Sequence, residues 1–150
     1  MLIGKQRMLD KFKDIDKDSR ELMTIPEMPQ YRKIRHIVGD TVFNGTEVEH
    51  VFEDSIGSCG DFRKRGLRFT LPYSCLYNSN FPNMLACGRI VSAHGEGWEV
   101  TRVIPVCTLT GEVAGIAAAI AVKNGIDPAH IEYKELRSKL EENGVLFALK

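Results

Sequence analysis

The sequence lacks an excess of either charge, because 20 lysines and arginines balance 20 aspartates and glutamates. Proteins that bind nucleic acid through its phosphates usually carry a basic excess or stripe, so this function is disfavoured. The basic residues at 63–65 and 68 form too short a cluster to change that and fit a solvated loop. The longest apolar run, residues 116–122, is far shorter than the roughly 20 residues that span a bilayer. The N-terminus also lacks the apolar segment of a secretory signal, and we expect a cytoplasmic protein without membrane or nucleic-acid partners.

Paired cysteines are also missing. The sequence has four cysteines, and none of them forms a C-x-x-C pair or matches the spacing of a zinc module. We therefore expect no metal site and four reduced thiols. Cys87 and Cys107 lie among apolar residues and are expected to be buried, as small hydrophobic side chains usually are.

What is present fits one ordinary domain with a helical N-terminal extension. The 150 residues are 43% hydrophobic and 27% charged, which is typical of soluble globular proteins. Apolar residues recur at helical spacing through residues 1–20, and Pro26 and Pro29 disfavour a continuing helix. The organisation predicted is an N-terminal amphipathic helix at 1–24 and a second part at 25–150.

The residue pattern of 30–77 predicts a mainly antiparallel sheet. The segments 31–38 and 41–43 flank a Gly-Asp turn and predict a hairpin. Residues 67–71 alternate as a half-exposed strand does, until Pro72 interrupts them. Residues 57–66 are expected to form an irregular loop, and 46–52 fit either a short helix or a strand.

The second half predicts one buried strand and two helices. Residues 83–87 are short and apolar, as in a strand buried on both faces. Residues 111–122 are rich in alanine and glycine and predict a long helix that ends near Gly125. Asp127 and Pro128 should begin a C-terminal helix, with Leu136 and Leu140 on one face. The fold class expected is α/β or α+β.

Several segments together resemble one known family. They are LPYSCLY at 71–77, NMLACGRIVSA at 83–93, RVIPVC at 102–107, GEVAGIAAA at 111–119 and RKIRHIVG at 32–39. In order and spacing they resemble the C-terminal portion of a bacterial family of FAD-dependent oxidoreductases, flavoproteins similar to glutathione reductase. The resemblance implies an FAD cofactor and a fold that forms part of an FAD-binding enzyme.

The resemblance also implies a site. Residues placed near the flavin ring are Gly88, Arg89, Ser92, Arg102, Pro105 and Gly111. The resemblance places a helix beginning near Cys107 against the ring, and the positive end of such a helix favours the negatively charged pyrimidine edge of a reduced flavin. The candidates for catalysis are His94, Glu96 and Arg102, although the family's histidine position falls on Gly95 here.

The glycine-rich turn that holds the FAD pyrophosphate is missing from the sequence. Gly95-Glu96-Gly97 opens like G-x-G-x-x-G, but Val100 stands where the third glycine is required. We expect the chain alone to retain little or no FAD and to bind a Rossmann-containing polypeptide or itself. Three hypotheses remain: the flavin-facing part of an oxidoreductase acting on an unidentified small substrate, a non-catalytic remnant or assembly module, and a small-anion binder at the helix N-terminus.

Overall fold

The structure is a computed structural model that describes residues 2–19 and 33–147, and the chain divides into two compact units, Met1–Tyr31 and Arg32–Lys150. The first unit contains helix α1 (Leu2–Lys11) and the 3-10 turn η1 (Lys17–Ser19). Helix α1 is shorter than the predicted helix of about 20 residues. Aspartates at 14, 16 and 18 follow it, and aspartate side chains compete with helical hydrogen bonds. The two prolines expected to end the helix lie outside the described residues.

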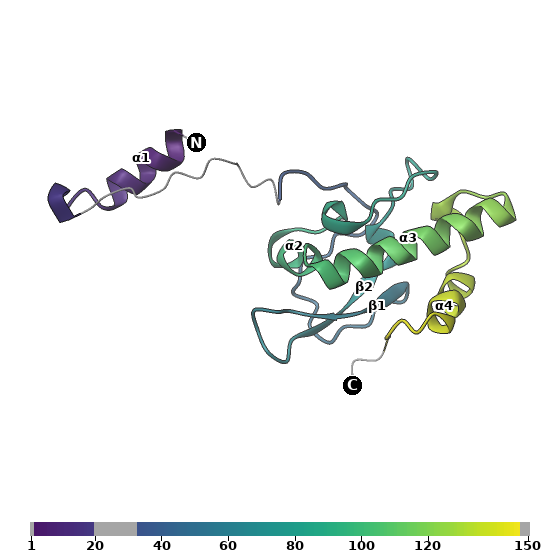
Figure 1. The fold of residues 1–150 in the computed structure, drawn as a ribbon. Helices are drawn as coiled ribbons and strands as arrows, with labels where there is room; N and C mark the ends of the chain where they lie inside the picture. Colours follow the sequence, from purple (N-terminus) through teal and green to yellow (C-terminus); the bar gives the residue numbers. More distant parts are fainter. Residues whose placement is uncertain (1, 20–32, 148–150) are drawn as a thin grey trace. The chain divides into compact units, whose positions relative to one another are not determined.

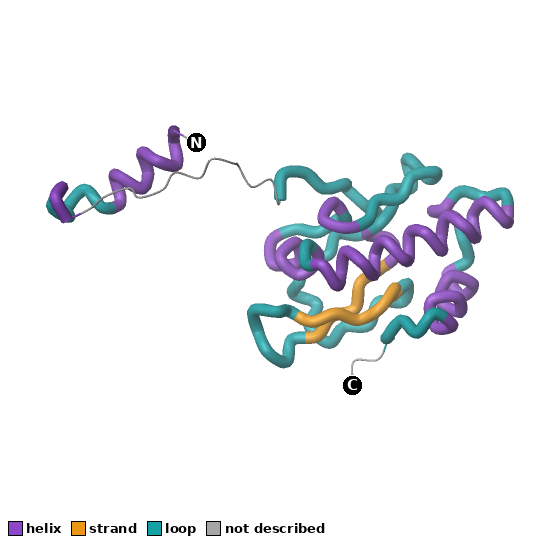
Figure 2. Tube along the Cα trace, in the orientation of Figure 1, coloured by secondary structure: helices purple, strands orange, loops and turns teal. Residues whose placement is uncertain are grey.

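The second unit is a small α+β domain, which confirms the predicted fold class (Figures 1 and 2). Strands β1 (Ser55–Gly60) and β2 (Arg68–Pro72) pair antiparallel, with Cys59 opposite Phe69. Three helices follow, α2 (Gly95–Thr101), α3 (Ile104–Asn124) and α4 (Tyr133–Glu142). The 3-10 turns η2 (Tyr73–Cys75) and η3 (Gly88–Ile90) lie between β2 and α2, and the 3-10 turn η4 (Pro128–His130) joins α3 to α4.

Helix α3 is the longest element and has the expected end signals. Pro105 stands in its first turn, where the missing N–H has no helical partner to lose. Gly125 ends it with a φ of 65°, a left-handed conformation that glycine adopts without strain. By length and composition alone α3 could cross a membrane, with a mean hydropathy of 1.7, and 33% of that segment is buried.

The core lies between the sheet, α3 and α4. The rings of Phe43 and Phe69 meet edge to face at 5.7 Å. From α4, Leu136 and Leu140 are fully buried, as their shared face predicted. Gly57 permits the close approach of α3 to β1, because a Cβ there would lie 3.0 Å from a methyl group of Leu109.

The hairpin predicted at 31–43 is wrong over its described part. No strand forms in residues 33–42, and this segment binds distant loops instead of itself. Ile37 donates its N–H to Ile90 O at 2.9 Å, and Asp40 donates to Tyr77 O at 3.0 Å. Phe43 then forms an isolated parallel bridge with Ala93. Local alternation cannot reveal such long-range partners.

Three further expectations need correction. Residues 83–87 form no strand, and within them only Ala86 is buried, with its N–H bound to Leu76 O at 2.8 Å. The segment reads as apolar but runs along the surface after a turn. Strand β1 occupies part of the predicted 57–66 loop, because β2 supplies its partners. Residues 46–52 are neither helix nor strand.

The C-terminal helix begins later than Asp127 and Pro128 suggested. These residues open η4, where Asp127 makes no side-chain cap, and α4 starts at Tyr133. Helix α4 ends at Asn143 and Gly144 as expected. The chain then turns back along β1, where Ser58 donates its N–H to Leu146 O at 2.8 Å.

Candidate functional site

The turn η3 is fastened to the first part of α3. Gly88 has a φ of 74°, and its N–H donates to Thr110 Oγ1 at 2.9 Å. The Thr110 hydroxyl lies 2.9 Å from Val106 O, to which it donates. Gly88 is therefore a glycine for a conformational reason, since a Cβ there would meet only Cys107 Sγ, at 3.9 Å. Gly88 belongs to the segment 83–93 that carries the family resemblance, and Thr110 lies between the two other such segments, 102–107 and 111–119.

The N-terminus of α3 lies beside this turn. Val103 is its N-cap residue and accepts the first helical bond, from Cys107 N–H at 2.9 Å. Ile104 is 77% exposed at the first position, and Pro105 is also exposed. The amide groups of a first helical turn have no helical acceptor and attract negative charge. This end of α3 can therefore stabilise an anion or a polar ligand edge.

Ser92 is closed off from solvent. Its backbone N–H donates to Cys75 O at 2.9 Å, and its own carbonyl accepts from Phe43 N–H at 3.0 Å. Its Oγ is buried without a hydrogen-bond partner among the described residues. A Cβ on Gly39 would lie 2.8 Å from the Ser92 Cβ, so Gly39 covers this side chain. A cofactor contact from Ser92 stays a prediction.

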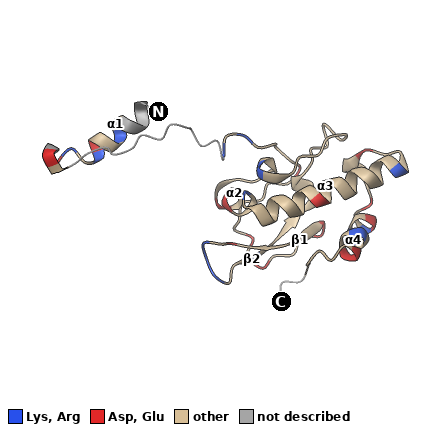
Figure 3. Cartoon of the chain, in the orientation of Figure 1, with Lys and Arg blue, Asp and Glu red and all other residues tan. Residues whose placement is uncertain are grey.

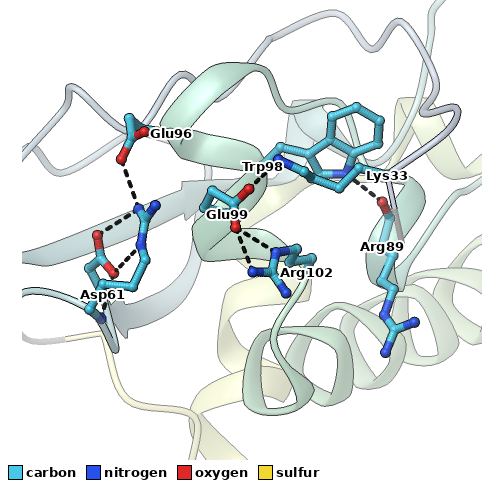
Figure 4. A network of polar contacts seen from close by, with 8 residues as sticks. Lys33, Asp61, Arg89, Glu96, Trp98, Glu99 and Arg102 are labelled. Carbon is cyan, nitrogen blue, oxygen red and sulfur yellow. Dashed lines mark hydrogen bonds and ion pairs between the residues drawn. The ribbon is translucent and has the colours of Figure 1, made fainter. Parts of the chain in front are cut away.

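Glu96 pairs with an arginine of the β1–β2 loop. Arg63 contacts Glu96 Oε2 at 2.9 Å and Asp61 Oδ2 at 2.9 Å, as Figure 4 shows. The hydrogen bond from Arg63 holds the pKa of Asp61 below its usual range. This bridge ties the exposed end of α2 to the sheet loop. Glu96 is thus engaged in an ion pair in this state of the chain.

Arg102 belongs to a second ion-pair group on the same helix. Glu99 accepts from Arg102 Nε at 2.6 Å and also binds Lys33 (Figure 4). Hydrogen bonds from Lys33 and from Arg102 lower the pKa of Glu99. The group fixes Arg102 at the link between α2 and α3. No described contact joins Arg102 to Glu96 or His94, so the three predicted catalytic side chains do not form one cluster here.

His94 and Arg89 are the least constrained of the predicted site residues. His94 is exposed at the N-cap of α2 and makes no side-chain cap. Arg89 accepts the indole N–H of Trp98 on its backbone oxygen at 2.8 Å, while its guanidinium extends away from Trp98 (Figure 4). Within residues 33–147 that guanidinium has no ion-pair partner.

One side of α3 is uncovered in the described structure. A Cβ added at Gly111 or Gly115 would meet nothing within 4 Å. We define the open face of α3 by the residues along this side: Ile104, Thr108, Gly111, Gly115, Ala118, Ala119 and Val122. Figure 3 shows that α3 carries little charge along its length.

The glycine pair on α2 is different, because Gly97 is packed against the chain itself. A Cβ on Gly97 would lie 2.2 Å from Phe43 O, and its N–H donates to Asn44 O at 2.8 Å. This backbone cannot accept a pyrophosphate while those contacts hold. The structure therefore agrees with the sequence that Gly95-Glu96-Gly97 is not a dinucleotide-binding turn.

A cleft of about 630 Å³ opens on the other flank of α3. Its walls come from the end of β1, the first half of α3 and the segment after α4, and it includes Pro105, Leu109 and Glu112. The lining is mostly apolar. Gly88 and Arg89 are not part of it, so this cleft and the η3 turn are separate features of α3.

Sequence reasoning missed several residues that build the site. Glu99 stands three residues before Arg102, a helical pairing distance that could have indicated their ion pair. Lys33 and Thr110 give no such signal, because their partners are 66 and 22 residues away. Their roles depend on tertiary contacts.

Comparison with known proteins identifies a family but no individual relative. A profile described as FAD dependent oxidoreductase matches residues 5–140. The match begins inside the predicted N-terminal segment and ends within α4. No curated protein and no solved structure matches significantly.

Proposed function

Because the chain belongs to the FAD dependent oxidoreductase family, we propose that it supplies the wall of a flavin site that faces the isoalloxazine ring. The observation that carries the proposal is the Gly88–Thr110 hydrogen bond of 2.9 Å. It holds the turn η3 against the positive end of α3. The sequence resemblance assigns both elements to the ring of the cofactor.

The residues present fit the ring of FAD. Gly88 offers backbone without a side chain, since the nearest neighbour of a Cβ there is Cys107 Sγ at 3.9 Å. Gly111 lies one helical turn further along α3 and leaves space above the helix. The flat face of an aromatic ring system suits such a surface, which carries little charge. Arg89 directly follows Gly88 and has no ion-pair partner among residues 33–147, so it would supply positive charge beside this surface.

The fit does not extend to the adenine and pyrophosphate end. Gly97 is occupied by chain contacts, and the described residues form no strand–turn–helix unit of the Rossmann type. We propose that residues outside these 150, on the same or another polypeptide, hold that end. The adenine half of the cofactor would reach the wall from there.

In this proposal the flavin and the residues of the chain contribute different parts of the chemistry. A bound flavin supplies hydride or electron transfer. The amide groups at the start of α3 stabilise negative charge placed before them, and Arg89 adds a mobile positive charge. His94 is exposed and is a candidate for proton transfer. Glu96 would need to leave Arg63 before it could transfer a proton.

The open face of α3 is the surface proposed for the rest of the enzyme. Val122 is 83% exposed and Ile104 is 77% exposed at opposite ends of it. Apolar strips of this kind usually mark contacts with another layer of protein. We propose that this face binds the Rossmann-containing part, and that copies of the isolated chain associate through it. A concentration-dependent mass in light scattering, abolished by Gly115→Lys, tests this.

Flavin binding tests the proposal directly. Trp98 is the only tryptophan, and its indole is bonded to η3, so its fluorescence reports on the proposed wall. The purified chain is titrated with FAD and with riboflavin, which keeps the ring but lacks the adenine end. We expect similar quenching of Trp98 by both, and little flavin retained on gel filtration.

Variants identify the surface involved. Gly111→Leu should fill the open space on α3 and remove the quenching, while Ser138→Leu on the exposed side of α4 should not. Circular dichroism of both variants checks that they fold. FAD bound much more tightly than riboflavin would mean that the chain has its own adenine site. Absence of quenching by either ligand would reject the wall and favour the assembly module, which needs only the open face.

A further inference from the structure

The cleft of about 630 Å³ beside α3 has no role in the proposed flavin wall. Its volume lies within the range of small-molecule sites, and its lining is mostly apolar. Two apolar side chains of the lining, Phe62 and Leu146, are 65% and 76% exposed. Exposed apolar groups gathered around a hollow favour an apolar occupant. The cleft therefore has the size and surface of a site for a small ligand.

The middle of the cleft is held by tight packing between its walls. Leu109 of α3 and Val145 after α4 both meet β1, since a Cβ on Gly57 would lie 3.0 Å from a methyl group of each. The Ser58 hydroxyl donates to Leu146 O at 3.0 Å. The three walls are thus joined to one another behind the cleft. The cleft is therefore a preformed feature of the packed domain.

The charged side chains in the lining are acidic. They are Asp61 and Glu112, and no lysine, arginine or histidine belongs to the lining in the described part of the chain. Asp61 is compensated by Arg63, which donates to both carboxylate oxygens. Glu112 is the single acidic residue of α3 (red in Figure 3), and within residues 33–147 it has no ion-pair partner. The cleft is therefore left with one uncompensated negative charge.

The C-terminal end of α4 adds to this negative charge. Asn143 and Gly144 directly follow the helix and line the cleft. The last carbonyl groups of a helix carry partial negative charge and favour a cation. The positive end of α3 is remote from Glu112, which lies roughly 13 Å along the helix from Val103 at 1.5 Å per residue. The Glu112 part of the cleft therefore favours a positive group.

The one thiol of the cleft favours binding over covalent chemistry. Cys59 is half-buried, and burial raises its pKa to about 12, so little thiolate is present near neutral pH. The other free cysteines lie outside the lining: Cys75 is buried, Cys87 is exposed and Cys107 is partly exposed. The expectation that Cys87 and Cys107 are buried is therefore wrong.

We propose that this cleft binds a small amphipathic cation, an ammonium group that carries an aromatic or aliphatic tail. The ammonium group donates to the Glu112 carboxylate beside the end of α4, and the tail lies along the apolar wall toward Phe62. The proposal rests on the cleft alone and requires neither flavin nor a partner chain. Its failure would leave the proposed flavin wall untouched.

Three probes of similar length separate the charge from the apolar contact: 4-phenylbutylammonium, neutral 4-phenylbutanol and anionic 4-phenylbutyrate. Each is titrated into the ¹⁵N-labelled 150-residue chain, and binding is followed by the chemical shifts of the backbone amides. We expect the ammonium probe to shift the amides of Gly60, Gly144 and Leu146 with a dissociation constant of about 1 mM. The alcohol should bind about fivefold more weakly, and the carboxylate more weakly still.

Variants assign the two ends of the site. Glu112→Gln should lower the affinity for the ammonium probe about fivefold and leave that for the alcohol unchanged. Its matched control is Glu53→Gln, which changes an exposed carboxylate outside the lining and should leave both affinities unchanged. Phe62→Ser should weaken the ammonium probe and the alcohol by the same factor, because it removes only apolar contact. Amide spectra of each variant check that it folds.

Four outcomes would overturn the proposal. They are the absence of shifts with every probe, shifts confined to residues outside the lining, equal affinity for the ammonium probe and the alcohol, and a preference for ammonium that survives Glu112→Gln. Tightest binding of 4-phenylbutyrate would also overturn it, because the start of α3 would then select the ligand instead of Glu112.

Discussion

The two faces of α3 differ in what touches them more than in how apolar they are. The face toward the sheet carries Val106, Thr110, Val113, Ala117, Ile120 and Ala121, all buried. The open face carries glycine, alanine, threonine, isoleucine and valine with nothing packed on them in the described structure. By composition alone, both faces are apolar enough to belong to a hydrophobic core. We propose that α3 packs against a second layer of protein on its open face, in addition to the layer that the described residues provide.

A charge introduced on each face of α3 should produce the largest difference in stability between the two faces. Val113→Asp buries a carboxylate without a partner, and we expect a loss of about 4 kcal/mol or more, enough to abolish cooperative unfolding. Gly115→Asp puts the same group on the open face and, at chain concentrations too low for self-association, should change stability by about 0.5 kcal/mol or less. Urea unfolding followed by circular dichroism measures both. Equal losses would mean that the open face is covered in solution.

A larger side chain on each face of α3 should give the next largest difference in stability. Ala117 is fully buried and Ala118 is exposed, although they are adjacent in sequence. Ala117→Leu should cost about 1–3 kcal/mol through overpacking, and Ala118→Leu should be nearly neutral. The difference in unfolding midpoint is the measurement. A destabilising Ala118→Leu would place another layer on that side.

The hydrogen bond between η3 and α3 can be tested with two threonines of the same helix. Thr110→Val removes the acceptor of the Gly88 N–H and should cost about 1–2 kcal/mol. Thr108→Val removes only a bond to Ile104 O on the exposed side and should cost less than about 0.5 kcal/mol. Hydrogen exchange at Gly88 should accelerate only in Thr110→Val. Unchanged exchange there would contradict the role given to this bond.

The smallest predicted effect is a gain in stability rather than a loss. Gly115→Ala meets nothing within 4 Å and should stabilise the isolated chain by about 0.5–1 kcal/mol, because alanine favours the helix. The same change should weaken any partner that needs close approach to the glycine. Thermal unfolding gives the first quantity and the association constant gives the second. A stabilised chain with unchanged association would remove this glycine from the proposed surface.

Much of the second half of the chain follows from local sequence. The alanine-rich run, Pro105 and Gly125 specify α3, since helix propensity and end signals act over a few residues. Residues 67–71 were sufficient to place β2, but the prediction of a half-exposed strand that Pro72 interrupts is wrong, because residues 69–72 are all buried and Pro72 is part of the strand. The facing pair Leu136 and Leu140 was sufficient for α4. The family follows from segments spread along the chain, and residues 5–140 match it.

Tertiary structure decided where those segments meet and which side chains stay available. The chain at 33–43 looks like a hairpin but binds η2 and η3, because its backbone groups find acceptors there. The segment 83–87 looks buried but leaves Cys87 exposed. Arg102 and Glu96 look free but are held by Glu99 and Arg63. These hydrogen bonds and ion pairs join residues that are 22 to 66 positions apart in the sequence. They form only when the core is packed, so the local sequence pattern does not predict them.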